Sequence, residues 1–536
     1  MTAPRRPLAA LPRAVLRAIV ALCLLAAPAA AETVYHRGND SDPETLDAHK
    51  TSTVAEAHIL RDLYEGLVVH DAEGRVVPGA AESWTVSADG RTYTFTLREA
   101  GRWSNGDPVT AEDWVFSFRR ILDPRTGAKY ATILYPILNA RALHKGEPGL
   151  EPERLGVRAL GPRTLAIGLE RPTAYFLELL THSTGLPLHA SSIARHGRDW
   201  VRPGNLVSNG AYRLAESVPN AGIRLTRNPH FHAAGTVAID QVVYHPVQDV
   251  SAGVRRYRAG ELHSLSDLPT DQVPALRRRL GDQVVLAPAL GVWCLVFNLR
   301  KAPFNDPRVR RALSLALDRE TLAERIWNDT MVPAYSLVPP GLPGYEPAAL
   351  ADLDLSPFER EDRARALLAE AGYGPERPLK VELRYNLGGN NRAMMVAVAA
   401  QWRTLGVETS FITADARTHF AHLRDGGDFD VARYAWIADY ADPQNFLFLL
   451  ESDNRGFNAG AYASPGFDAL MREAAEEPDR ERRLGLLRRA EALLMEDLPW
   501  IPVLHYRSKH LISPRLTGFR PNLAGVAPSR YLRLEP

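Results

Sequence analysis

A strand–helix–strand pattern in the C-terminal half limits the folds open to this chain more than any other feature. Residues 379–385 alternate apolar and polar side chains, residues 393–405 carry apolar side chains at helical spacing, and residues 407–412 are again β-forming. Gly406 ends the helix. Two strands joined through a helix pair in parallel with a right-handed crossover. The pattern therefore predicts an α/β domain, which we place at residues 293–502.

The first third of the chain has a different character. Residues 91–98 alternate apolar and polar β-formers, and the Asp89–Gly90 turn joins them to residues 83–86 in a predicted hairpin. Thr110 and Asp113 have the spacing of a capping box and begin a helix. We therefore predict a β-rich domain over residues 69–190.

The length and the composition bound the number of domains. At about 150 residues per domain, the 536 residues suggest three or four units. With 45% hydrophobic and 24% charged residues, the chain is neither disordered nor collagen-like. We expect the segments outside the two predicted domains to form one discontinuous domain, made of residues 32–68, 191–292 and 503–536.

The N-terminus has the three parts of a secretory signal peptide. Four arginines precede an apolar run over residues 18–27, and three alanines at 29–31 form a cleavage site. The apolar run is short for a membrane anchor, which is the alternative. Removal of residues 1–31 leaves 60 basic and 63 acidic residues, a formal charge of −3. A nearly neutral chain without long runs of like charge is a poor candidate for nucleic-acid binding.

Local catalytic and metal-binding signatures are missing from the sequence. There is no G-x-S-x-G, H-E-x-x-H or P-loop pattern. Cys294, the one cysteine after residue 31, lies in an apolar run and is predicted to be buried in a strand. His419 and His422 are three residues apart, but two ligands do not make a metal site, and we expect solvated histidines there. We predict no metal and no cofactor, although an exported hydrolase with a carboxylate pair stays open, since such a pair has no local signature.

Several short stretches follow one another through almost the whole chain. They are SDPETLD at 41–47, YEGL at 64–67, PGAAESW at 78–84, WSNGDPVTA at 103–111, SNGAY at 208–212, RNP at 227–229, PFNDPRVR at 303–310 and FDVARYAWIADY at 429–440. Together they resemble the family 5 extracellular solute-binding proteins of ABC importers, and most of all the oligopeptide-binding members.

The resemblance implies an α/β fold of the periplasmic binding protein type II-like kind, a two-lobed clamp with an extra β-rich domain. Its two crossing segments would fall near residues 292–298 and 502–507. It further implies a monomer in the periplasm that captures oligopeptides by lobe closure and delivers them to an inner-membrane ABC permease, and not an enzyme. A receptor for a murein peptide, a dipeptide, haem or a nickel chelate is the alternative within the family, and a signalling-only receptor is another.

The resemblance also assigns ligand-binding residues. Asp439 occupies the position that anchors the ligand's α-amino group, which needs an acidic partner. Glu56 matches an acid that pairs with basic residues across the closed cleft, and Arg433 matches a basic position suited to a peptide carboxylate or to a closing ion pair. The remaining matched positions line the pocket or contribute charge: Arg424, Trp436, Tyr130 and Tyr335.

Four positions depart from the pattern of the relatives. Arg417 stands where relatives have an aromatic side chain over the first peptide unit, and Asn391 stands where a histidine serves some ligands' carboxylates. Gly291 and Ile437 replace a pair of cysteines. Arg417 could favour an anionic ligand, such as a cell-wall peptide with acidic residues.

Overall fold

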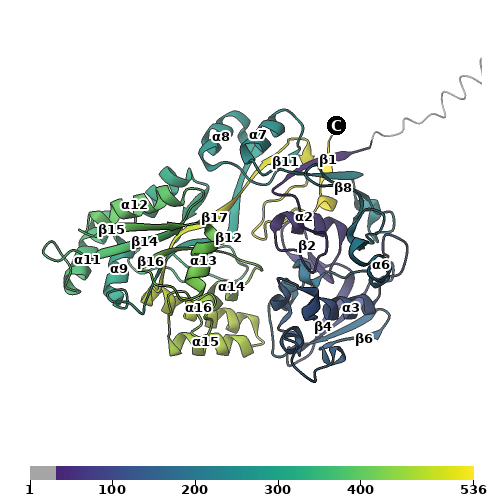
Figure 1. Cartoon of the computed structure of the whole chain (residues 1–536), viewed down its shortest axis with the longest axis horizontal. Coiled ribbons are helices and arrows are strands. Elements are labelled where there is room, and N and C mark those ends of the chain that lie inside the picture. The colour runs from purple at the N-terminus through teal and green to yellow at the C-terminus, as the bar shows by residue number, and fades with distance from the viewer. Residues whose placement is uncertain (1–31, 536) are drawn as a thin grey trace, which may run out of the picture.

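Residues 32–535, which the computed structural model describes, form two lobes joined by two long strands (Figure 1). The predicted signal peptide, residues 1–31, lies outside the described residues. Between residues 32 and 535, no helix is long and apolar enough to cross a membrane.

One mixed sheet runs through both lobes. Its strands, in spatial order, are β15 (Glu408–Ala414), β14 (Lys380–Asn386), β16 (Val431–Ile437), β12 (Val284–Phe297), β17 (Trp500–Ile512), β11 (Ser264–Leu265), β1 (Val34–Asn39), β10 (Gln241–Pro246), β9 (Gly222–Arg227) and β8 (Tyr212–Val218), with β13 (Met331–Pro333) beside β17. The principal helices are α2 (Val54–Leu63), α3 (Ala111–Leu122), α7 (Val250–Arg258), α8 (Val273–Leu280), α9 (Pro307–Leu315), α11 (Pro357–Glu370), α12 (Asn391–Arg403), α13 (Ala416–Arg424), α15 (Pro465–Glu476) and α16 (Arg480–Asp497).

The predicted strand–helix–strand unit is confirmed. β14 and β15 pair in parallel, with Leu383 opposite Phe411, and α12 connects them. The inner face of α12 is buried through Met394, Val398 and Trp402. β16 is also parallel to β14, so the carboxyl ends of all three strands meet at one edge of the sheet. Polar loops that follow those strands are therefore gathered in one place.

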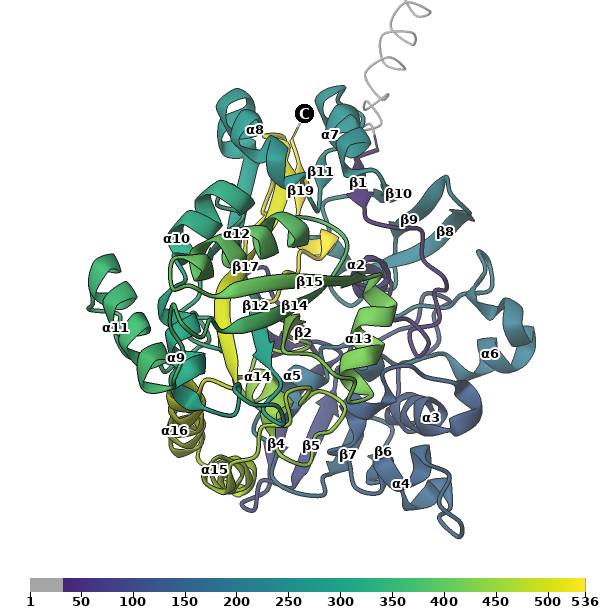
Figure 2. The ribbon, with the colours of Figure 1, turned by 60° about the vertical axis from the view of Figure 1, so that its left-hand side comes forward.

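The predictions for the two crossing segments need one correction. The first crossing segment, expected near residues 292–298, belongs to a longer strand, since β12 begins at Val284 and runs through Pro288. β12 pairs antiparallel with β17 on both sides of an irregularity between Pro288 and Val292, which keeps the strand continuous. Figure 2 shows the two strands side by side through the molecule.

The β-rich segment forms its own antiparallel sheet, in the order β4 (Ala81–Val86), β5 (Thr92–Leu97), β7 (Thr164–Gly168) and β6 (Val157–Gly161). The predicted hairpin is thus confirmed as β4 and β5. The predicted helix start is confirmed as well, since the Asp113 carboxylate accepts a hydrogen bond from the Thr110 N–H at 2.7 Å. Trp103, Trp114 and Phe118 fill the core beneath this sheet.

Cys294 is buried in β12, as predicted. His419 is not the solvated side chain expected, because α13 lies against the sheet and places the His419 Nε2 2.9 Å from the Arg433 carbonyl. No group of three potential metal ligands occurs in residues 32–535.

Candidate functional site

A cavity of about 280 Å³ lies where the two lobes face each other. Its walls come from distant parts of the chain: the start of α2, Tyr130 with residues 178–183, residues 437–441 after β16, and residues 523–525 near the C-terminus. Because these segments belong to different lobes, a molecule held in the cavity touches both lobes at once.

Asp439 lies two residues beyond the end of β16, at the sheet edge where β14 and β15 also end. Its N–H donates to the Asn445 Oδ1 at 3.1 Å, which holds the turn. Its carboxylate faces the cavity without a hydrogen bond or ion pair from any described residue, and the surrounding walls raise its pKa to about 6. A carboxylate that has a raised pKa and no counterion favours a cationic ligand.

The opposite walls carry complementary groups. Tyr130 and Asp439 both line the cavity, and burial together with the negative charge of Asp439 raises the pKa of Tyr130. The ring of His182 is 5.4 Å from that of Tyr130, and burial together with the charge of Arg61 lowers the pKa of His182 to about 4. Burial and the nearby Arg37 lower the pKa of Arg61 to about 10.

Arg61 is a binding candidate that sequence reasoning missed. It lines the cavity from α2 and makes no ion pair within residues 32–535. No local pattern singles it out, because α2 also carries Glu56, His58 and Asp62, all three buried. With Asp439 on one wall and Arg61 on another, the cavity suits a ligand that carries both an ammonium and a carboxylate group.

Arg433 and Asn391 lie outside the walls of this cavity. Arg433 is buried in β16, and its guanidinium donates to the Asn386 Oδ1 at 3.0 Å and to the Tyr506 hydroxyl at 3.4 Å. Burial lowers the pKa of Arg433, whose Nε has no partner. Asn391 is buried too, accepting from the Trp293 Nε1 at 3.3 Å and donating to the Asn386 carbonyl at 3.1 Å. Their predicted roles toward ligand carboxylates stay predictions.

Glu56 makes its hydrogen bonds within its own lobe, and its pairing across the closed cleft stays a prediction. It is 1% exposed and serves as the acid of a capping box at the start of α2. One carboxylate oxygen accepts from the Ser52 N–H at 2.8 Å and from the Thr53 N–H at 2.9 Å, and the other accepts from the Glu44 N–H. Both oxygens are therefore engaged within its own lobe, and no basic residue of the other lobe contacts them.

Trp436 supports the Asp439 turn from behind the cavity. Its Nε1 donates at 3.0 Å to the same Asn445 Oδ1 that accepts the Asp439 N–H. Its ring packs edge-on against Phe448 and Phe457. Trp436, predicted to line the pocket, therefore belongs to an aromatic cluster that holds the Asp439 turn in position.

Three other predicted site residues lie apart from Asp439. Tyr335 donates to Glu320 and lies 5.2 Å from the Arg319 guanidinium, beside a small separate cavity. Arg417 and Arg424 are exposed on α13, where Arg424 is 3.4 Å from Asp425. None of the three lines the interlobe cavity.

Gly291 and Ile437 are direct partners in the antiparallel pairing of β12 and β16. A Cβ on Gly291 would lie 2.4 Å from the Ile437 Cδ1, so glycine leaves the space that the isoleucine occupies. Ile437 also lines the cavity. The family's cysteine positions are therefore adjacent here, with close packing in place of a disulfide.

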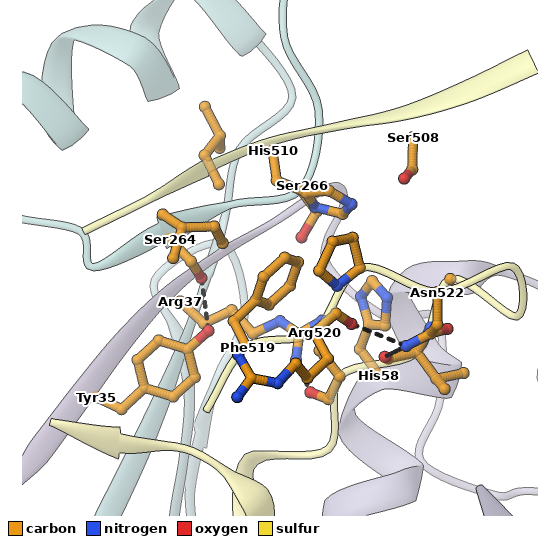
Figure 3. A pocket seen from close by; sticks show the side chains of 16 residues that line it. Tyr35, Arg37, His58, Ser264, Ser266, Ser508, His510, Phe519, Arg520 and Asn522 are labelled. Atoms are coloured by element: carbon orange, nitrogen blue, oxygen red, sulfur yellow. Dashed lines mark hydrogen bonds between the residues drawn. The ribbon is translucent and has the colours of Figure 1, made fainter. Parts of the chain in front are cut away.

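A second cavity lies within the lobe built from the two ends of the chain (Figure 3). Around it, the Arg37 Nη1 donates to the Ala527 carbonyl at 3.0 Å, and Tyr35 and Ser264 share a hydrogen bond. Its volume of about 20 Å³ is close to the space for one water molecule. It is therefore too small for a peptide and belongs to the packing beneath the C-terminal segment.

The sequence and the fold both match known proteins. Residues 75–458 match the family described as bacterial extracellular solute-binding proteins, family 5 Middle. The periplasmic oligopeptide-binding protein OppA of Salmonella typhimurium is 37% identical over 488 residues, which cover 90% of this chain and 89% of that protein. The unliganded open form of the periplasmic murein tripeptide binding protein MppA has a TM-score of 0.85 at 34% identity, covering 94% of this chain and 98% of that one. Haemophilus influenzae OppA in complex with RPPGFSPFR has a TM-score of 0.76 at 32% identity, covering 94% and 99%.

The chain belongs to the family 5 bacterial extracellular solute-binding proteins. The predicted resemblance is confirmed, and so is the predicted fold class, a type II-like two-lobed clamp with an extra β-rich domain.

Proposed function

We propose that this protein is the solute-binding component of an ABC importer, which captures oligopeptides between its lobes and delivers them to a membrane permease. The observation that carries the proposal is the unpaired Asp439 carboxylate in the interlobe cavity. A peptide α-amino group, with a pKa of about 7.7–8.0, is cationic at neutral pH. A charge-assisted hydrogen bond between the two groups contributes about 1.5–3 kcal/mol.

The rest of the cavity supports a zwitterionic ligand. Arg61 offers an unpaired guanidinium for a carboxylate. Main-chain hydrogen bonds to an extended peptide do not depend on its side chains, so a receptor of this kind tolerates many sequences. The names of the relatives, two of them oligopeptide-binding proteins, support the same ligand class.

We infer the setting from the same relatives. Residues 1–31 act as a cleaved signal peptide, and the mature protein works in the periplasm as a monomer without cofactor or enzymatic activity. The division into residues 32–68 with 191–292 and 503–536, residues 69–190, and residues 293–502 stays a prediction. A murein-peptide receptor is the second candidate, favoured by the TM-score of 0.85 with the murein tripeptide binding protein.

Calorimetry with the mature protein tests the proposal. Trialanine and its N-acetyl form would be titrated into the wild type, Asp439→Asn and Glu178→Gln, after mass spectrometry of any co-purified ligand. Glu178 is the matched control, because it lines the same cavity but already lies 3.4 Å from His70. We expect trialanine to bind Asp439→Asn at least about tenfold more weakly and Glu178→Gln within threefold of the wild type. Equal affinity of the wild type for both peptides would contradict the amine anchor, and peptide hydrolysis would indicate an enzyme.

A further inference from the structure

Two tyrosines from opposite lobes stack on each other at one end of the cavity. Tyr175 of the β-rich lobe and Tyr440 of the α/β lobe have ring centroids 5.1 Å apart and planes inclined by 1°. The guanidinium of Arg483, also in the α/β lobe, lies 5.0 Å from the centroid of Tyr175. Tyr175 therefore contacts two separate groups of the facing lobe, and each stacked contact is favourable.

The α/β side of this stack is firmly held. Both terminal nitrogens of Arg483 donate to the Asp442 carboxylate at 2.8 Å, and this pair is buried. The Tyr440 hydroxyl donates to the Gln444 Oε1 at 2.6 Å. A fork-to-fork ion pair and a hydroxyl bond fix the orientation of the groups that meet Tyr175.

The stack lies between two cavities. Tyr440 lines the cavity of about 280 Å³ that holds Asp439. Tyr175, Gln444 and Arg483 line another interlobe cavity of about 490 Å³. Asp439 immediately precedes Tyr440 in the chain, and both residues line the cavity of about 280 Å³.

We propose that the Tyr175–Tyr440 stack is the wall that ends the binding cavity beyond the ligand's α-amino group, and that it limits the size of any group attached to the amine nitrogen. This inference rests on the proposed function, because it needs the amine at Asp439. A group attached to the amine nitrogen extends past Asp439 toward the rings, which cannot yield without parting the lobes. Removing one ring joins the cavities and gives the added group a place.

Acyl groups of different length test the wall separately from the amine. Acetyl-trialanine and butanoyl-trialanine have lost the same positive charge and differ only in size. The dissociation constants of both would be measured by calorimetry, with trialanine as reference, for the wild type and for Tyr175→Ala. Tyr175→Phe is the matched control, because it keeps the ring and so the stack. Tyr175→Leu is a second small variant in case the alanine variant does not fold.

In the wild type and Tyr175→Phe, we expect the butanoyl peptide to bind about tenfold or more weakly than the acetyl peptide, the effect of added methylenes in a closed site. In Tyr175→Ala and Tyr175→Leu, the two capped peptides should bind within threefold of each other. If affinity depended on acyl-group size in the same way in all four proteins, the proposed wall would be contradicted. Failure of the proposed function looks different, because capped and free peptides would then bind the wild type alike.

Discussion

Peptide binding should weaken about tenfold between pH 7 and pH 5, because the free Asp439 carboxyl has a pKa of about 6. That group is about 90% ionised at pH 7 and about 10% ionised at pH 5. Trialanine itself keeps both charges over this range, since its amine titrates at about 7.7–8.0 and its carboxyl at about 3.3–3.7. The binding-competent fraction thus falls tenfold, or about 1.4 kcal/mol. Because the pKa of this carboxyl is raised, affinity is full above pH 6 and is lost as the pH falls through 6.

The other titratable groups around the cavity do not account for this loss of affinity between pH 7 and pH 5. The pKa of His182 is about 4 and that of Arg61 is about 10, so neither changes charge between pH 5 and pH 7. His70 and Glu178 form a pair on the same wall, and a His70→Asn variant removes the remaining histidine. Tyr130 stays neutral because its pKa is raised above 10.0.

Isothermal titration of trialanine at pH 5, 6 and 7 measures the effect. The wild type and His70→Asn should show the tenfold loss, whereas Asp439→Asn should bind weakly and with no dependence on pH in this range. A pH-independent wild type would refute the reasoning, and so would an Asp439→Asn variant that keeps the tenfold fall.

Three further predictions concern packing and pairing. Both oxygens of the buried Glu491 carboxylate accept hydrogen bonds from buried donors, so Glu491→Gln should lower the free energy of unfolding by about 1–3 kcal/mol in urea denaturation; an unchanged midpoint would contradict this. Arg483→Ala leaves the buried Asp442 carboxylate without its ion-pair partner. It should lower the free energy of unfolding by about 3–5 kcal/mol in the same assay, whereas a surface substitution such as Arg424→Ala should not. The double variant Gly291→Cys and Ile437→Cys should form a disulfide on oxidation, because these residues pair across β12 and β16, and stabilise the protein by up to about 5 kcal/mol; a folded protein that stays reduced under oxidant would refute the pairing.

Local sequence patterns predicted the fold well where a single helix or strand shows its own hydrophobic periodicity. The strand–helix–strand unit around α12 follows from the hydrophobic periodicities of its strands and its helix, with Gly406 as the end of the helix. The full length of β12 was not predicted, because Pro288 interrupts the apolar run and the pairing with β17 continues on both sides of it. Whether a strand survives such an interruption depends on a partner more than two hundred residues away in the chain, which no local pattern contains.

The site was predicted less completely, for two different reasons. Asp439 could be singled out because it lies in a long stretch that resembles the family, just beyond β16. Thr53 and Glu56 have the spacing of a capping box, so the local sequence was enough to predict the structural role of Glu56. The family resemblance drew attention to a binding role instead. Arg61 could not be found by pattern, since the absence of a counterion is a property of the assembled cavity.

The irregular point of the β12–β17 ribbon is also part of the cavity wall. Interstrand register shifts between Pro288 and Val292, and Ala289 and Leu290, which lie in that gap, line the space beside Asp439. A molecule bound in the cavity would therefore lie against the ribbon that joins the two lobes, and not only against the lobes themselves.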